Sequence, residues 1–421
     1  MKNKVLTGLL LVLIGGWGSL LAQNAGSNYA RQVNTLIGTK GVGLTSGYLY
    51  PGATYPYGMV QFTPSYFSKR SGFVINQLSG GGCEHMGNFP TFPVKGKLKM
   101  SPDNILNYRI NISEEKGHAG YYEAMVQEDI KAKLTVTERT GMANYEYPAD
   151  QQYGTVIIGG GISATPIEQA AVVITAPNKC EGYAEGGNFC GLRTPYKVYF
   201  VAEFDADALE SGTWKRDELK PNTTFAEGEY SGVYFTFDVS KKKNIQYKIG
   251  VSYVSVENAR ENLKAENTGW DFLQIQNQAE SKWNDYLGKI EVEGTNPDRT
   301  TQFYTHLYRS FIHPNVCSDV NGEYMGADFK VHKSRSKHYT SFSNWDTYRT
   351  QIQLLSMLDP EVASDIVISH QLFAEEAGGA YPRWVMANIE TGVMQGDPTP
   401  ILISNAYAFG ARNYDPVSYT H

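Results

Sequence analysis

The chain has 421 residues and a formal net charge of −6 at pH 7, from 43 acidic and 37 basic side chains. An acidic chain without basic runs is a poor candidate for nucleic-acid binding, which depends on neutralising phosphates. The length favours at least two domains, and beyond residue 23 no stretch is long and apolar enough to span a bilayer.

The first 23 residues have the pattern of an export signal. Lys2 and Lys4 provide a positive start, the apolar stretch runs from Val5 to Leu21, and small Ala22 lies at its end. Three glycines within the stretch, and its short length, argue against a permanent membrane anchor. We therefore expect an exported protein, either periplasmic or secreted.

Residues 24–255 are predicted to form a β-sandwich. Apolar or alternating runs are separated by clusters of Gly, Pro, Asn and Asp, and no helical pattern lies between them. These runs cover residues 57–62, 131–136, 153–158, 196–204, 230–239 and 245–256.

The cysteines allow one disulfide prediction. Cys180 and Cys190 flank a Gly-rich segment, and in an oxidising compartment they are candidates for a bridge across it. The other two are Cys83 and Cys317, and the spacing of the four matches no zinc-binding pattern.

Helical patterns replace strands after residue 255. Residues 256–295 are predicted to be a helical linker, because apolar residues recur at four-residue spacing from Ile275 to Leu287, and a short strand at 290–292 is expected to close it. Residues 296–421 are predicted to contain helices at 297–314, 346–358, 360–378 and 400–412. Helices joined by long loops are typical of a toroid of α-hairpins, but four are too few to close one.

A first candidate site lies in the β region, where three glycines precede Cys83, Glu84 and His85. Glycines let the backbone approach a ligand closely, here with two polar side chains beside it. Ordinary turn chemistry explains the same pattern, and both interpretations stay open at this point. A phosphate-binding loop is disfavoured because no Lys-Ser/Thr pair follows Gly80–Gly82.

Two further candidate clusters lie in the helical region. Trp345, Asp346 and Arg349 offer an indole face and charged hydrogen-bonding groups, which suit a sugar ring. Asp397 lies on a long loop together with Trp384 and Glu390. The alternative is that the aromatic residues belong to the core and that Asp346 only favours the helix start. Hydrolysis of a glycosidic bond needs two carboxyl groups, and sequence spacing alone shows no convergent pair.

Taken in order, the sequence motifs closely resemble glycoside hydrolase family 92. The matching segments are 33–39, 50–61, 78–83, 120–122, 189–191, 303–308, 343–349 and 394–398. The resemblance implies an N-terminal β-sandwich packed on an (α/α)6 toroid, here incomplete. It also implies exported, calcium-dependent exo-α-mannosidases of inverting mechanism, which remove terminal α-linked mannose from glycans.

The resemblance assigns roles to the candidate residues. Asp346, beside Trp345, belongs to the pocket for the terminal mannose, and the loop Gly82–His85 shapes the leaving-group side. A tryptophan near Cys83 is associated with α-1,2-linked substrates, and this chain lacks it. α-1,3-, α-1,4-, α-1,6- and phosphate-linked mannose therefore all stay open.

The resemblance also predicts what lies outside this sequence. The catalytic acid, the paired base aspartates and most of the Ca²⁺ ligands are expected beyond His421, so no catalytic or metal-binding residue is assigned within the chain. We expect the 421-residue chain to be inactive alone and to expose apolar helix faces. The alternative from another functional class is a non-catalytic glycan-binding protein that uses the same pocket.

Overall fold

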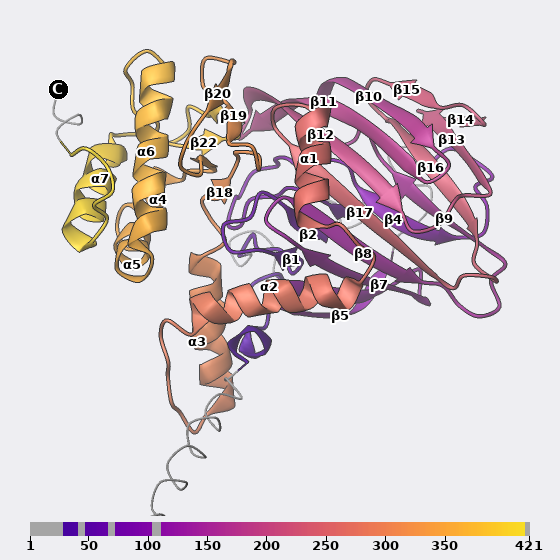
Figure 1. The fold of residues 1–421 in the computed structure, drawn as a ribbon, viewed down its shortest axis with the longest axis horizontal. Coiled ribbons are helices and arrows are strands. Elements are labelled where there is room, and N and C mark those ends of the chain that lie inside the picture. The colour runs from indigo at the N-terminus through magenta and orange to yellow at the C-terminus, as the bar shows by residue number, and fades with distance from the viewer. Residues whose placement is uncertain (1–27, 41–46, 66–71, 103–110, 417–421) are drawn as a thin grey trace, which may run out of the picture.

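The structure is a computed structural model that describes residues 28–40, 47–65, 72–102 and 111–416. The predicted export signal lies outside these residues. Two antiparallel sheets face each other as a sandwich, and most helices gather at one end of it (Figure 1). The predicted class, a β-sandwich followed by a helical region, is confirmed.

The first sheet has eight strands and the second has nine. In spatial order the first contains β1 (Ala53–Thr54), β2 (Gln61–Pro64), β3 (Phe73–Val74), β4 (Thr91–Lys95), β9 (Tyr153–Ile158), β16 (Ser231–Asp238), β13 (Glu210–Lys215) and β14 (Glu218–Pro221). The second contains β15 (Phe225–Glu227), β10 (Ile167–Ala176), β11 (Lys179–Phe189), β12 (Leu192–Phe204), β17 (Asn244–Ser252), β8 (Thr140–Glu146), β7 (Ile130–Val136), β6 (Tyr121–Val126) and β5 (Ile112–His118).

Alternating burial explains why the strands form two layers. Every second residue of β6 is buried, and β12 alternates in the same way along most of its length. The inward side chains fill the space between the sheets with rings such as Phe62, Phe73 and Tyr247, which have no exposed surface. Burying one such side chain contributes about 2 kcal/mol, so this layer dominates the stability of the sandwich.

One predicted strand is shorter in the structure. The run at 57–62 is extended only from Gln61, the first residue of β2. Tyr57 has a φ of 54°, and its N–H donates to the Phe311 carbonyl instead of a neighbouring strand. The start of this run therefore connects the sandwich to the helical region.

Helices α1 (Val256–Glu266), α2 (Phe272–Leu287) and α3 (Pro297–Ser310) follow the last sandwich strand. The Ser255 and Asp271 side chains cap α1 and α2, and α2 lies along the sandwich (Figure 1). The predicted apolar face of α2 is buried, and the Trp283 indole donates to the Thr54 carbonyl at 2.7 Å. The strand predicted at 290–292 is absent, because the Val292 N–H donates to the Tyr304 hydroxyl rather than to a strand.

The remaining elements form the helical end. They are α4 (Asn344–Thr347), α5 (Gln351–Leu358), α6 (Pro360–Glu376), α7 (Pro398–Phe409), the 3-10 turn η1 (Tyr29–Gln32), and the short strands β18 (Asn315–Val316), β19 (Glu323–Met325), β20 (Val331–Lys333), β21 (Tyr339–Thr340), β22 (Val385–Met386) and β23 (Ile389–Glu390). None of the helices in the described ranges is long and apolar enough to cross a membrane.

The helix predicted at 346–358 is two helices, α4 and α5. The Tyr348 carbonyl accepts hydrogen bonds from the side chains of Gln353 and Asn405, at 3.0 and 3.2 Å. Thr350 has non-helical φ and ψ angles. The chain therefore turns between the two helices instead of continuing one.

Apolar side chains are exposed on two of these helices. Met357 on α5 and Ile401, Tyr407 and Phe409 on α7 each expose at least two fifths of their surface.

Candidate functional site

A cavity of about 660 Å³ lies where loops of the sandwich meet the helical end. It brings Gly82 and Cys83 from the first half of the chain to the same space as Asp346 from the second. Its wall is formed by Leu78, Ser79, Gly80, Gly81, Gly82, Cys83, Phe189, Cys190, Arg309, Ser310, His313, Pro314, Ser341, Phe342, Ser343, Asn344, Asp346, Thr347, Gln351, Ile352, Leu355, Ile366, His370, Trp384, Val393, Met394 and Leu402.

His85 fixes the Gly-rich loop through two backbone contacts and does not face the cavity. Only 1% of the residue is exposed, and its Nε2 accepts the Leu78 N–H at 2.8 Å while its Nδ1 lies 2.7 Å from the Cys83 carbonyl. These partners require a neutral ring with the proton on Nδ1, and burial lowers the pKa of His85 to about 4. A Cβ on Gly81 would lie 2.8 Å from this ring, so the loop needs glycine there. His85 does not line the cavity and shapes the loop instead.

His313 fixes the same loop from the helical side. Its Nε2 accepts the Ser79 N–H at 2.8 Å, and its Nδ1 lies 2.7 Å from the Asn315 side-chain oxygen. Burial lowers the pKa of His313 to about 4 as well. Two successive N–H groups of the loop thus bind to two uncharged imidazoles.

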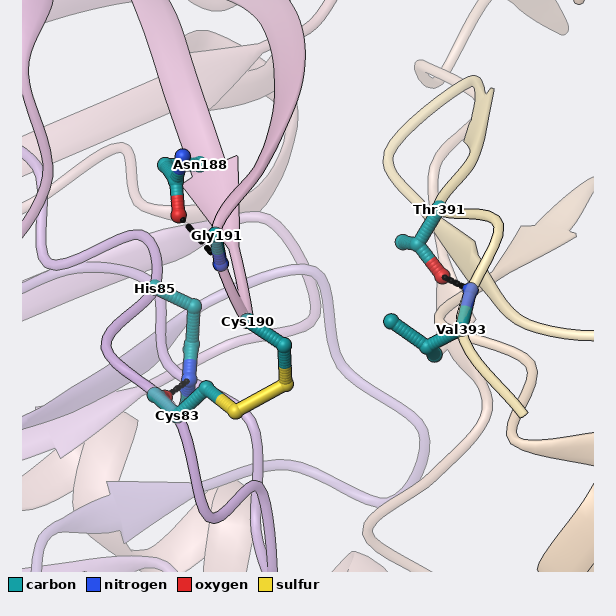
Figure 2. Close-up of a disulfide and its surroundings, with 7 residues drawn as sticks. All are labelled: Cys83, His85, Asn188, Cys190, Gly191, Thr391 and Val393. Atoms are coloured by element: carbon teal, nitrogen blue, oxygen red, sulfur yellow. Dashed lines mark hydrogen bonds between the residues drawn. A yellow bond between two sulfur atoms is a disulfide. The ribbon is translucent and has the colours of Figure 1, made fainter.

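A disulfide between Cys83 and Cys190 closes the sandwich side of the cavity. Their Cα atoms are 5.2 Å apart, and the bond ties the Gly-rich loop to the turn between β11 and β12 (Figure 2). The predicted Cys180–Cys190 bridge is wrong. Cys180 is buried near the start of β11, and the extended strand places it roughly 30 Å from Cys190, whereas a disulfide spans at most about 7 Å.

Asp346 is an exposed carboxylate at the cavity wall. It lies in the first turn of α4, and the Ser343 hydroxyl donates to one of its oxygens. Trp345 and Arg349 do not line the cavity: the indole is 39% exposed, and the Arg349 Nε donates to the Tyr348 hydroxyl at 2.9 Å.

The aromatic surface of the cavity comes from residues that the sequence analysis did not assign to it. Phe189 of β11 and Trp384 stack with their ring centres 4.4 Å apart and an interplanar angle of 27°. Trp384 is also bridged to Ser343 by backbone pairing, which joins this stack to the segment before Asp346. The loop position of Trp384 was a signal in the sequence, but nothing there indicated its partner.

The floor of the cavity contains Asn344 and His370. The Asn344 side-chain N–H groups donate to the Pro382 carbonyl and the Thr399 hydroxyl, and its oxygen lies 3.0 Å from His370 Nε2. Asn344 has no exposed surface. Its hydrogen-bond partners belong to α6 (His370), to α7 (Thr399) and to the loop that contains Pro382, so all three segments fix its position.

The other predicted acidic residues lie outside the cavity wall. Glu84 is exposed, Asp397 is exposed at the start of α7, and Glu390 accepts the N–H groups of Arg383 and Trp384. Among the described residues that line the cavity, Asp346 is the only one with a carboxyl group.

The described residues do not fit a calcium site. Ca²⁺ takes six to eight oxygen ligands. Within the described ranges no three His, Cys, Asp or Glu residues are grouped so that they could hold a metal ion.

Comparisons with known proteins identify the family. Residues 32–252 match the glycosyl hydrolase family 92 N-terminal domain, and residues 258–420 match the glycosyl hydrolase family 92 catalytic domain. The chain belongs to glycosyl hydrolase family 92. The family assignment made from the sequence motifs is therefore confirmed, as is its placement among glycosidases.

Solved structures of family 92 share the fold. A family 92 α-mannosidase from Bacteroides thetaiotaomicron is 25% identical, with a TM-score of 0.84 over 92% of this chain and 55% of its own. The same enzyme in complex with mannoimidazole gives a TM-score of 0.83 at 25% identity, over 92% of this chain and 54% of its own.

A fungal relative is described as an uncharacterised secreted glycosidase of Arthroderma benhamiae. It is 26% identical over 383 residues, which cover 81% of this chain and 48% of the relative. The family 92 chain described here thus spans about half the length of the relatives it matches.

Proposed function

We propose that this chain is the sugar-binding part of an exported, inverting α-mannosidase that removes terminal α-linked mannose from glycans. One observation carries the proposal: in a family 92 chain, the Gly-rich loop and Asp346 line one cavity. The mannoimidazole complex of the α-mannosidase relative supports mannose as the bound sugar.

The cavity offers the contacts that a hexose needs. The Asp346 carboxylate can accept hydrogen bonds from two ring hydroxyls, and such charge-assisted bonds are stronger than neutral ones. Phe189 and Trp384 line the cavity but are only 3% and 7% exposed, so their stack gives the sugar a rigid apolar edge rather than an open ring face. Gly82 lets the backbone approach the sugar closely. We propose direct contacts for Asp346, Gly82 and Cys83.

Other predicted residues receive different assignments. His85 positions the Gly-rich loop rather than contacting sugar. Trp345, Arg349, Glu84 and Asp397 do not line the cavity, so we assign them no direct contact.

Proton transfer is proposed to depend on groups outside the described residues. Inverting hydrolysis places two carboxyl groups about 6.5–9.5 Å apart on either side of the bond. Only Asp346 contributes a carboxyl group to the cavity within the described ranges. The Ca²⁺ that the family resemblance implies would likewise need ligands from elsewhere.

Binding is expected to depend on Asp346. Asp346→Asn keeps the shape but removes the charge, so the affinity for mannoimidazole should fall at least about tenfold, because hydrogen bonds to a charged group contribute about 1.5–3 kcal/mol. Isothermal titration calorimetry measures this directly. Asp217→Asn, in the exposed turn between β13 and β14, is the matched control and should bind like the unchanged chain. If the Asp346→Asn variant binds mannoimidazole as tightly as the unchanged chain does, the proposed site is wrong.

The 421-residue chain alone is expected to bind without turnover. Among the described residues only Asp346 brings a carboxyl group to the cavity, so they supply no pair of proton donor and base on either side of the bond. The purified chain is assayed with an aryl α-mannoside in the presence of Ca²⁺. Release of the aryl group at an enzymatic rate would falsify this expectation.

A further inference from the structure

The sugar cavity has a buried floor and an exposed rim. On the floor, Asn344 and His370 have no exposed surface, and Leu355 exposes 1% of its own. Among the described residues that line the cavity, five are exposed, and we call them the rim: Gly80, Gly82, Cys190, Asp346 and Met394. A group that extends from a sugar inside the cavity therefore reaches solvent past this rim.

Among the described residues of the rim, Met394 is the only large apolar side chain. It exposes 46% of its surface, whereas Phe189 and Trp384 of the same cavity expose 3% and 7%. The other rim residues are two glycines, a disulfide-bonded cysteine and a carboxylate. Covering exposed apolar surface is favourable in proportion to its area, so a ligand group that packs on Met394 gains affinity.

The loop that carries Met394 is held by hydrogen bonds on both sides of this residue. The Arg383 guanidinium donates from Nε to the Val393 carbonyl at 3.0 Å and from Nη1 to the Gly396 carbonyl at 3.4 Å. The Arg383 N–H in turn donates to a Glu390 carboxylate oxygen at 2.7 Å. Met394 itself has a φ of 64°, which is uncommon for a residue with a side chain. The methionine is therefore positioned before a ligand arrives, which reduces the entropy lost on binding.

The Cys83–Cys190 disulfide lies on the other side of the cavity from this loop. Figure 2 shows the disulfide on the sandwich side and Val393, next to Met394 in sequence, on the helical side. All four side chains line the cavity. The methionine thioether is polarisable and makes favourable contacts with ring edges. The opening is thus bordered on both sides by uncharged side chains.

A bound mannoside can extend only away from the buried floor. A terminal mannose has one covalent connection to the rest of its substrate, through the anomeric oxygen. With the mannose inside the cavity, the group on that oxygen extends outward past the rim. Building on the proposed function, we propose that Met394 determines specificity by packing against this leaving group. The cavity therefore favours mannosides whose leaving group presents an apolar ring face.

The affinities for two simple mannosides test this contact. Ligand-observed NMR titration of the 421-residue chain measures the dissociation constants of methyl α-mannoside and phenyl α-mannoside. The phenyl ligand is expected to bind about tenfold more tightly. In Met394→Ala this ratio should fall to about twofold, while the affinity for methyl α-mannoside stays unchanged. Met394→Leu should keep most of the ratio, because leucine is also large and apolar.

A matched control separates this contact from a general loss of apolar surface. Met357→Ala removes a similarly exposed methionine, 56% exposed on α5, that does not line the cavity. This variant should keep the full ratio between the phenyl and methyl ligands. Melting of each variant, followed by circular dichroism, establishes that it is folded.

An apolar ring face can come from an aromatic group or from a second sugar. The α-1,3- and α-1,6-linked methyl mannobiosides, titrated in the same way, distinguish the two sources. Tighter binding that depends on Met394 for a mannobioside assigns the face to a second sugar. Tighter binding that depends on Met394 for the phenyl ligand alone assigns it to an aromatic group.

Two results would overturn the role of Met394. One is equal affinity for methyl and phenyl α-mannoside in the unchanged chain, and the other is a Met394→Ala variant that weakens both ligands alike. In either case methyl α-mannoside still binds, so the proposed function stands. If neither mannoside binds, the proposed function fails together with the role of Met394.

Discussion

Removal of the Cys83–Cys190 disulfide is expected to lower the free energy of unfolding by about 4 kcal/mol. The bond closes a loop with a sequence separation of 107, and a crosslink across a loop of that size restricts the unfolded chain strongly. The Cys83→Ala, Cys190→Ala double variant is compared with the unchanged chain by urea unfolding. The unchanged chain with dithiothreitol should behave like the variant.

The same change is expected to weaken mannoimidazole binding several-fold, because the sandwich edge of the cavity is no longer tied to the β11–β12 turn. Adding dithiothreitol to the double variant is the control and should change nothing, since the remaining Cys180 and Cys317 are buried and unpaired. An unfolding midpoint that is the same with and without the bond would contradict the stability expectation, and an unchanged mannoimidazole affinity would contradict the binding expectation.

Local patterns predicted much of the fold because they depend on neighbours in sequence. The run at 153–158 corresponds to β9, and the four-residue spacing from Ile275 to Leu287 corresponds to the buried face of α2. Strands and helices turn every second or every third to fourth side chain toward the core, so the spacing of apolar residues along the sequence indicates each element. The Gly-rich loop and Asp346 were identified as candidate site residues from residue type alone.

The rest depended on contacts between distant segments. No local signal distinguishes Cys83 from Cys180 as the partner of Cys190, because the choice is set by the length and direction of β11. The stack of Phe189 on Trp384 joins the two halves of the chain, and no local pattern in the sequence indicates it. His85, predicted as a ligand contact, faces the backbone of its own loop, a role that residue type cannot separate from binding.

Acidification from pH 6.5 to 4 is expected to destabilise the protein steeply. An unfolded histidine has a pKa near 6.5, while burial holds the pKa of His85 and His313 at about 4. In this range the unfolded chain therefore binds protons that the folded chain does not, so stability present above pH 6.5 is lost as the pH falls. Each of the two contributes about 3 kcal/mol, and a domain has only about 5–15 kcal/mol in total.

Other buried groups modify this profile in known directions. Burial also lowers the pKa of His370 to about 4 and of His338 to about 3, which adds to the loss. Asp365 acts the other way: with a pKa raised to about 6, it stabilises the fold as the pH falls from 6 towards its unfolded value. Burial also raises the pKa of Asp319, which acts in the same direction as Asp365. Four histidines with lowered pKa values outnumber these two carboxyls, so stability still increases with pH over this range.

Urea unfolding midpoints between pH 7.5 and 4.5 measure this slope. In the His85→Gln, His313→Gln double variant the amide oxygens can still accept the Leu78 and Ser79 N–H groups but do not titrate here. The variant should lose about 1.4 kcal/mol of slope per pH unit for each histidine replaced, near pH 5. An unchanged slope would mean that these rings are already charged in the folded protein.

Because both rings accept N–H groups of the Gly-rich loop, protonating either removes an acceptor from the wall of the sugar cavity. Mannoimidazole binding should therefore fail at a higher pH than the global fold.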